Sequence, residues 1–77
     1  MNDATLLEYG QRELPAFRAD MRAIAGIDGG SRRYVAARLR EVLRNANDRR
    51  ESAGLTRTEA EYACVLAAKA ERHKVKT

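Results

Sequence analysis

The sequence predicts a small all-α protein, a bundle of three to four helices, and three observations lead to this. Apolar residues recur at intervals of three and four, as on one face of an α-helix, and no segment alternates with the period of two that is typical of strands. Residues that favour helix starts and helix ends separate these segments. The 77 residues suffice for one small domain over 1–77, in which we expect 1–3 and 74–77 to be frayed.

The first helical segment is interrupted near its middle. Apolar residues follow one another at helical spacing through most of 4–26. Pro15 breaks this pattern, because it lacks a backbone N–H and its ring crowds the carbonyl of Gln11. We therefore expect two helices, over 4–11 and 15–26, and a single kinked helix is the alternative.

The next segment, over 31–53, has the clearest helix signals of the chain. Ser31 is a suitable N-cap, and Gly54 is a suitable stop because glycine adopts left-handed angles without a Cβ clash. One side of this helix is apolar and carries Val35, Leu39, Val42, Leu43 and Ala46. The opposite side carries Arg33, Arg40 and Arg44. The sequence thus predicts a helix with an apolar face and a basic face.

The last helix is predicted over 57–73. Thr56 and Glu59 have the spacing of a capping box, in which each side chain accepts from the backbone N–H of the other residue. Its buried face is expected to comprise Tyr62, Ala63, Leu66, Ala67 and Ala70. Alanines at 60, 63, 67 and 70 leave room for another helix to approach closely. Because the connections are short, we expect 31–53 and 57–73 to form an antiparallel hairpin, which the helix around Phe17 covers.

The material for a hydrophobic core is scarce. Leu, Ile, Val and Phe together number 14 of 77 residues, below the roughly 20% that is usual for a stable globular chain. Alanine is equally frequent, and it favours helix but buries little area. Such a chain packs its helices very closely, dimerises, or depends on a partner.

Residues 55–70 resemble the opening helix of a LuxR-type helix-turn-helix. They begin with the pattern Leu-Thr-x-x-Glu, from Leu55 to Glu59, and continue with Val65 and Leu66. The resemblance covers about a fifth of the chain. The family places a turn and a recognition helix next, which 71–77 do not provide, so we infer no function from the resemblance.

No combination of side chains is typical of a catalytic centre or a cofactor site. His73 is the only histidine and Cys64 the only cysteine, and their spacing puts them on opposite sides of one helix. Two such ligands do not make a zinc site. No pair of carboxylates lies on an apolar face, where a raised pKa would favour acid–base chemistry. We therefore expect a protein that is not an enzyme and that takes no metal, cofactor or small-molecule substrate.

The sequence also indicates the compartment. The single cysteine excludes a disulfide framework within the chain. The first residues have no basic region followed by an apolar run, as a secretory signal would. No window has the roughly 18 apolar residues of a membrane span. We expect a cytoplasmic protein that does not contact membranes.

The charge of the chain points to an acidic partner. The net charge is +4 and the pI is near 9.7. Most of the bases are arginine, whose planar guanidinium pairs with carboxylate or phosphate. Two glycines before the helix start at Ser31 can turn backbone amides toward an anion. The candidate residues for binding an acidic partner or an anion are Arg18, Arg22, Gly29, Gly30, Arg32, Arg33, Arg40 and Arg44.

Three hypotheses about function follow. The first is a small regulatory protein, of the kind that phages and mobile elements encode, which binds and modulates or inhibits a larger protein machine, including one that handles nucleic acid. The second is a dimeric nucleic-acid-binding transcriptional regulator that places the arginines of the 31–53 helix on phosphates. The third is a structural subunit that assembles through its helices. The mixed charge and the lack of a complete recognition motif favour the first, and a homodimer is compatible with all three.

Overall fold

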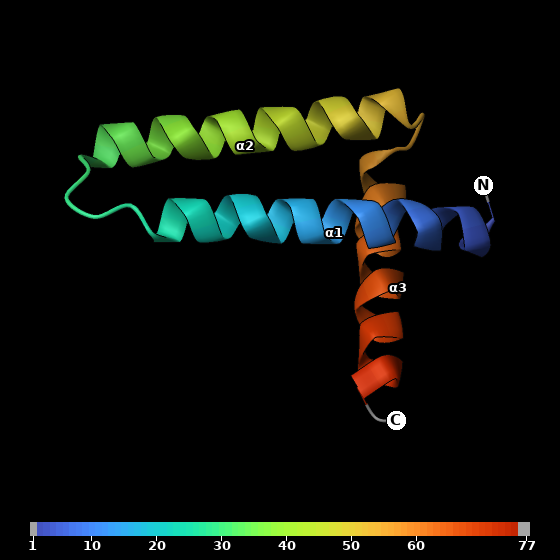
Figure 1. Ribbon diagram of the computed structural model, residues 1–77. Helices are drawn as coiled ribbons and strands as arrows, with labels where there is room; N and C mark the ends of the chain where they lie inside the picture. The colour runs from blue at the N-terminus through green and yellow to red at the C-terminus, as the bar shows by residue number, and fades with distance from the viewer. Residues whose placement is uncertain (1, 76–77) are drawn as a thin grey trace.

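The computed structural model describes residues 2–75 and contains three α-helices. They are α1 (Asp3–Ala25), α2 (Arg32–Ser52) and α3 (Arg57–Val75), and the described residues form no strand. The expectation of an all-α fold is therefore confirmed. α1 and α2 lie side by side and run in opposite directions, and α3 crosses behind α1 near the end where α2 stops (Figure 1).

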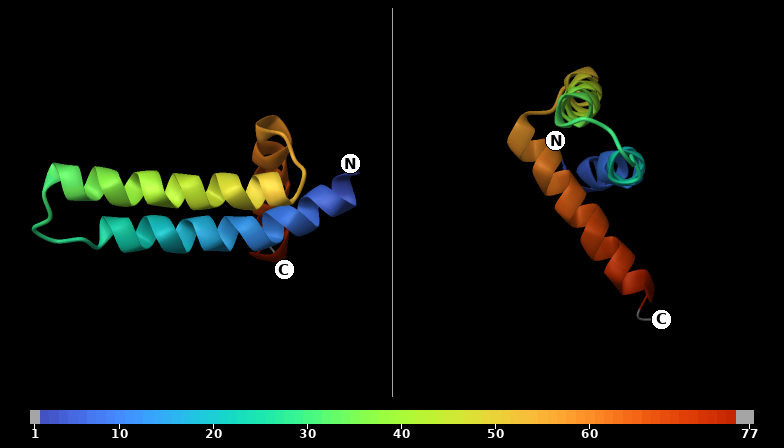
Figure 2. Two further views of the ribbon diagram at one scale, coloured as in Figure 1. Left: turned by 90° about the horizontal axis from the view of Figure 1, so that it is seen from above. Right: turned by 90° about the vertical axis from the view of Figure 1, so that its left-hand side faces the viewer.

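α1 is one continuous helix, so the expectation of two helices over 4–11 and 15–26 is wrong. Pro15 lies inside it, and the first turns bend away from the axis of the rest (Figure 2, left). A proline within a helix removes one hydrogen bond and pushes the preceding turn aside, which bends the helix without ending it. α3 holds both parts of α1, because Gly10 contacts Ala63 and Arg18 pairs with Glu71.

The helix signals predicted at Ser31, Gly54 and Thr56–Glu59 are confirmed, and Asn2 serves as the N-cap of α1. The Asn2 side chain accepts from the N–H of Thr5 (2.9 Å), and Ser31 Oγ accepts from the N–H of Tyr34 (3.1 Å). Gly54 has φ +72°, and the N–H of the next residue, Leu55, donates to the carbonyl of Arg50, as in a Schellman motif. The capping box of α3 also forms. The Thr56 N–H donates to Glu59 Oε1 (2.9 Å), and the Glu59 N–H donates to Thr56 Oγ1 (3.1 Å).

The helices extend further toward the ends of the chain than expected. α1 begins at Asp3 with Asn2 as its N-cap, and α3 continues through Lys74 to Val75. Positions 1, 76 and 77 of the predicted frayed ends lie outside the described residues.

The predicted hairpin of 31–53 with 57–73 is wrong in its pairing. The antiparallel neighbour of α2 is α1, and α3 packs across α1 (Figure 2). Gly10 explains this choice, because a Cβ at position 10 would overlap the backbone carbonyl of Ala63. Ala63 and Ala67 are buried at the crossing. The alanines of α3 thus allow a close helix approach, as predicted, but the helix that approaches is α1.

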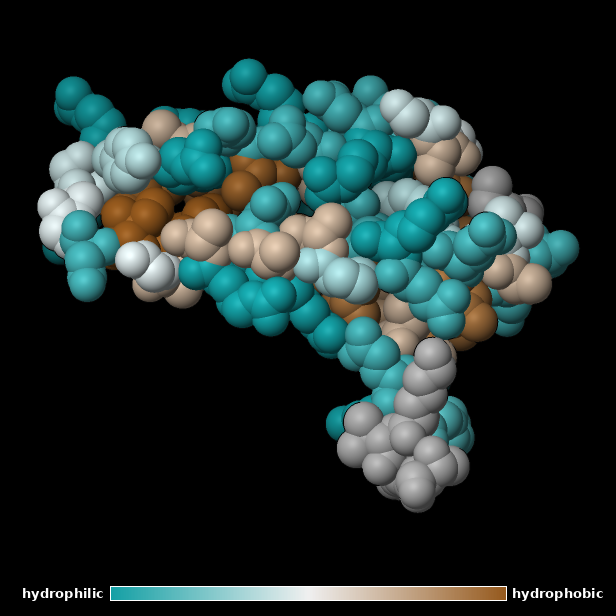
Figure 3. Space-filling view, viewed as in Figure 1, coloured by the Kyte–Doolittle hydropathy of each residue, from teal (hydrophilic) through white to brown (hydrophobic). Residues whose placement is uncertain are grey.

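The core lies where the three helices meet. It consists of Leu6, Tyr9, Leu55 and Ala63, and Ala53, Ala60 and Leu66 pack against it. Tyr62 lies outside it, contrary to expectation, because its side chain is 44% exposed and its hydroxyl donates to Asp3 (3.2 Å). Toward the α1–α2 connection the burial is much poorer. Val42 is the one buried residue of α2, and apolar atoms are visible between the two helices in Figure 3.

Candidate interaction surface

Three of the predicted arginines form a row along one edge of α2. Arg33, Arg40 and Arg44 are exposed, and their spacings of seven and four residues place them on one side of the helix. Arg49 marks the side of α2 that faces α1, since it pairs with Glu13 of α1. Arg40 precedes Arg49 by nine residues, about two and a half turns. The row therefore points away from α1.

Two of the three carboxylates of α2 lie against other arginines, and the third, Asp48, is four residues after Arg44 but forms no ion pair among the described residues. Glu41 pairs with Arg38 (2.8 Å), and Glu51 lies 3.7 Å from Arg50. Among the described residues, no ion pair involves Arg33, Arg40 or Arg44. The edge of α2 thus carries three guanidinium groups that the fold itself does not use.

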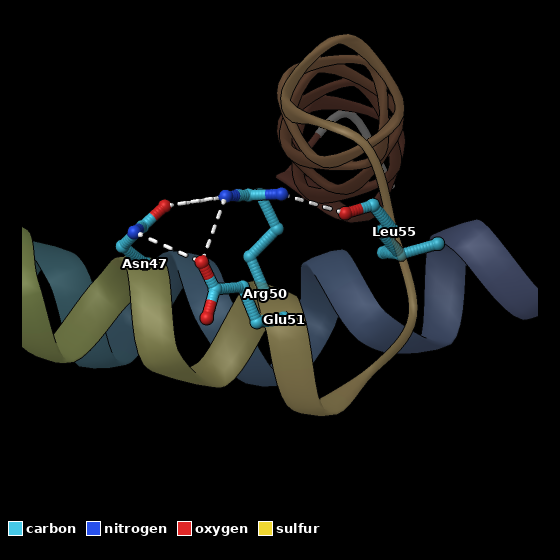
Figure 4. Close-up of polar contacts among 4 residues, drawn as sticks. All are labelled: Asn47, Arg50, Glu51 and Leu55. Carbon is cyan, nitrogen blue, oxygen red and sulfur yellow. Dashed lines mark hydrogen bonds and ion pairs between the residues drawn. The ribbon is translucent and has the colours of Figure 1, made fainter.

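The arginine at position 50 has a structural role and does not belong to the row. Its Nη1 donates to the carbonyl of Leu55 (2.8 Å), which ties the end of α2 to the start of α3 (Figure 4). The other side of the guanidinium donates to Asn47 Oδ1 and lies near Glu51. These contacts stabilise the Gly54 turn between the two helices.

Arg18 and Arg22 do not extend the row, although they were candidates for this role. Arg18 forms two hydrogen bonds with the Glu71 carboxylate, at 2.8 and 3.1 Å, and so joins α1 to α3. Arg22 follows Glu13 by nine residues and therefore points away from α2. These two arginines lie on the α1 edge of the pair, and the row lies on the α2 edge.

The turn before α2 is shaped by its glycines. Gly29 has φ +71°, a left-handed conformation that side chains disfavour. A Cβ at Gly30 would come within 2.9 Å of Ile27 Cγ2 and 3.3 Å of the Tyr34 ring. Arg32 follows the N-cap Ser31 and is exposed. The two glycines therefore have a geometrical role, in the reversal of the chain and in packing beside Ile27.

One polar contact of the fold has no counterpart among the sequence predictions. Glu13 is buried, and Arg49 donates two hydrogen bonds to its carboxylate, from Nε (2.7 Å) and Nη2 (2.8 Å). The pair raises the pKa of Arg49, chiefly through the hydrogen bond with Glu13. The pKa of the adjacent Tyr9 is raised by burial and by the Glu13 charge. The sequence offers one indication of this contact, because Glu13 follows Tyr9 by four residues and therefore lies on the buried side of α1.

The side chains capable of chemistry are separated. Cys64 is half-buried, and burial raises the pKa of its thiol. His73 is exposed near the end of α3. Among the described residues, no three His, Cys, Asp or Glu side chains are placed to hold a metal ion. A shallow hollow beside the α1–α3 crossing is lined by Gln11, Ala67, Ala70 and Glu71, and the Glu71 carboxylate is already paired with Arg18.

Within residues 2–75 no helix has both the length and the apolar character that crossing a membrane requires. Comparisons with models of protein families, with curated proteins and with solved structures find no match to this chain. The surface chemistry of the helices is therefore the basis for a functional proposal.

Proposed function

We propose that this protein is a small regulatory protein that binds a larger protein through the arginine row and modulates its activity. The observation that carries the proposal is that Arg33, Arg40 and Arg44 lie exposed along one helix edge, with no ion pair among the described residues. A row of like charges is unfavourable for the isolated protein, because each guanidinium repels its neighbours. Carboxylates on an acidic partner surface would neutralise these charges and so remove the repulsion.

The helix also fixes the spacing of the row. From Arg33 to Arg44 the rise along α2 is about 16 Å, and the Glu13–Arg49 pair anchors the helix to α1. Because the helix backbone is already ordered, only the arginine side chains lose conformational freedom on binding. Each guanidinium can form two parallel hydrogen bonds with a carboxylate.

Nucleic acid is the alternative partner, because phosphates also accept from arginine. Two features favour a protein partner. The row is a single straight line on one edge, and Arg18 and Arg22, which could have broadened it, lie on the other edge. No described aromatic side chain accompanies the row closely enough in sequence to form a stacking platform for bases, apart from Tyr34 beside Arg33.

The test compares two charge reversals that alter the net charge equally. Arg40→Glu/Arg44→Glu removes the row, and Arg12→Glu/Arg72→Glu changes two exposed arginines elsewhere; each lowers the net charge from +4 to zero. The probes are poly-glutamate, as an acidic polypeptide, and a random-sequence DNA duplex, each at about 50 and about 200 mM salt.

The proposal predicts that the row variant loses about tenfold or more of the affinity for poly-glutamate while the control variant retains most of it. Equal losses in both variants would show that net charge alone matters. Binding to the duplex that is tighter than binding to poly-glutamate, and that is lost at higher salt and in the row variant, would show that the partner is nucleic acid.

A further inference from the structure

One side of α1 is apolar beyond the point where α3 leaves it. Gly10 marks this side, because it touches Ala63 of α3. Phe17 and Met21 follow Gly10 by seven and eleven residues, about two and three turns, and so lie on the same side of the helix. Phe17 is half-buried and Met21 is exposed.

α2 has a matching apolar side. Arg50 identifies the side of α2 that faces α3, because its guanidinium donates to the carbonyl of Leu55, just before α3 begins. Leu43 and Leu39 precede Arg50 by seven and eleven residues and therefore share its side of α2. Leu39 is 36% exposed and Leu43 is 50% exposed. Figure 2 (right) shows that α3 lies on one side of the α1–α2 pair.

These four residues form one patch, which we call the open face: Phe17, Met21, Leu39 and Leu43. The Glu13–Arg49 pair sets the register of the two antiparallel helices. Counting from that pair, Met21 lies level with position 41, midway between Leu39 and Leu43. α3 covers this side of the pair only at its other end, around Gly10.

The overall dimensions indicate that the chain exposes more surface than a compact protein of the same mass. Its solvent-accessible surface is 5944 Å², whereas a compact monomer of this mass exposes about 4,700 Å². Its radius of gyration is 14.3 Å, against about 11.5 Å for a compact domain of this length. This excess of about 1,200 Å² belongs to the whole molecule, including the part of α3 that projects from the α1–α2 pair, and it exceeds the roughly 800 Å² that one partner of a stable dimer buries.

We propose that a second copy of this chain covers the open face, so that two α1–α2 pairs pack face to face as a four-helix bundle. The open face holds part of the limited large apolar material of the chain, and covering it would add to a core that is otherwise small. Another copy provides such a cover without any other component. Antiparallel helix pairs with apolar inner faces combine readily into such bundles.

The dimer leaves the arginine row accessible. Arg40 and Arg44 are on the edge of α2 that points away from α1, outside the open face. Two rows on one dimer would strengthen binding to an extended acidic partner by raising the local concentration of the second site. Dimer formation itself requires no ligand, so it is tested independently of the proposed function.

The test is the mass of the full chain in solution by sedimentation velocity at micromolar concentration. The wild type is expected at twice the 8.6 kDa of one chain. Leu43→Glu, and separately Met21→Glu, are expected to weaken the dimer about a hundredfold, because each places a charge in the contact. The matched control is Val65→Glu, since Val65 is 49% exposed on α3 and lies outside the open face. This control is expected to remain a dimer.

Far-UV circular dichroism shows whether each variant keeps its helices, so that loss of the dimer is not confused with unfolding. A dimer also predicts a melting temperature that rises with protein concentration for the wild type and not for Leu43→Glu. A wild type that is monomeric at all concentrations would overturn the proposal, and so would a dimer that survives both open-face substitutions. A monomer that takes up an acidic amphipathic peptide on the open face would assign the face to a different partner.

Discussion

Gly10 lies where α1 and α3 touch, and its lack of a side chain is what permits the contact. Glycine has a low helix propensity, so the local preference at this position is against a helix. In the structure it is buried, and a Cβ there would overlap the carbonyl of Ala63 and come within 3.1 Å of the Ala67 Cβ. Local helix preference and the long-range contact therefore make opposite demands at this residue.

We predict that Gly10→Ala destabilises the protein by about 1–3 kcal/mol, although alanine normally favours a helix. The added methyl group forces α1 and α3 apart at the buried crossing. The control is Gly26→Ala at the end of α1, where the nearest atom to a new Cβ would be 3.5 Å away. We expect this control to change stability by less than about 0.5 kcal/mol. The measurement is the free energy of unfolding in urea. A Gly10→Ala variant as stable as the wild type would contradict the close contact of α1 with α3 at Gly10.

Local signals at single residues were predicted well from the sequence. The cap at Ser31, the stop at Gly54 and the Thr56–Glu59 box form as expected, because each involves residues within a few positions of one another. The partners of Gly10 and Glu13 could not be predicted in this way. Those contacts span more than thirty residues of sequence, and nothing in the local pattern selects Ala63 or Arg49 over other residues of the same type.

At the scale of elements, α3 depends on its capping box. Hydrogen bonds with Thr56 lower the pKa of Glu59, the backbone N–H of Thr56 contributing most. A group with a lowered pKa in the folded protein stabilises it fully above the unfolded pKa and loses this contribution as the pH falls through the folded value. The charged form of Glu59 therefore favours the folded state near neutral pH.

We predict that Glu59→Gln lowers the melting temperature at about pH 7 and that the difference from the wild type disappears as the pH falls through the lowered pKa of Glu59. Thermal melts across this range measure it. The control repeats the comparison in a Thr56→Ala background, which keeps the backbone N–H but removes the reciprocal hydroxyl. There the pH-dependent difference should be smaller. A difference that stays constant down to about pH 3 would show that the Glu59 charge is not responsible.

α1 shows why element boundaries were harder to predict than element types. The helical spacing of the apolar residues in 4–26 and the unfavourable effect of Pro15 on a helix were both interpreted correctly as local features. The error was to expect that Pro15 would end the helix. A proline inside a helix disfavours it by about 3 kcal/mol, and this cost can be offset when both flanks are held by tertiary contacts. α3 supplies those contacts at Gly10 and Arg18, on either side of Pro15.

At the scale of the whole molecule, pairing of helices was the main error. A short connection at Gly54 implied that α2 and α3 would be antiparallel neighbours. The turn instead directs α3 across α1, where small residues on both helices meet. The predicted scarcity of core material matches an arrangement in which the apolar residues are concentrated at the crossing and α2 contributes Val42 as its one buried residue. The row of arginines on α2 could be predicted because helical spacing alone defines it. That Arg18 and Arg22 lie apart from this row could not be predicted, because it depends on which helices pack together.

The attachment of α2 to the rest of the molecule depends strongly on the Glu13–Arg49 pair. Glu13 is almost fully buried, and Arg49 is 37% exposed at its side chain, so solvent screens the interaction in part. We predict that Glu13→Gln costs about 1–2 kcal/mol of unfolding free energy, less than a fully buried ion pair would. The loss arises because the Arg49 guanidinium then lacks a carboxylate at its two donors.

The matched control is Glu41→Gln, which removes an exposed ion pair with Arg38 within α2. Such pairs contribute only a few tenths of a kcal/mol, about 0.2–0.5. Both variants are compared with the wild type in urea at one protein concentration, because association would add to the apparent stability. The expected order is a larger loss for Glu13→Gln than for Glu41→Gln. Equal small losses would mean that Val42 and the tie from Arg50 to Leu55 hold α2 in place without the ion pair.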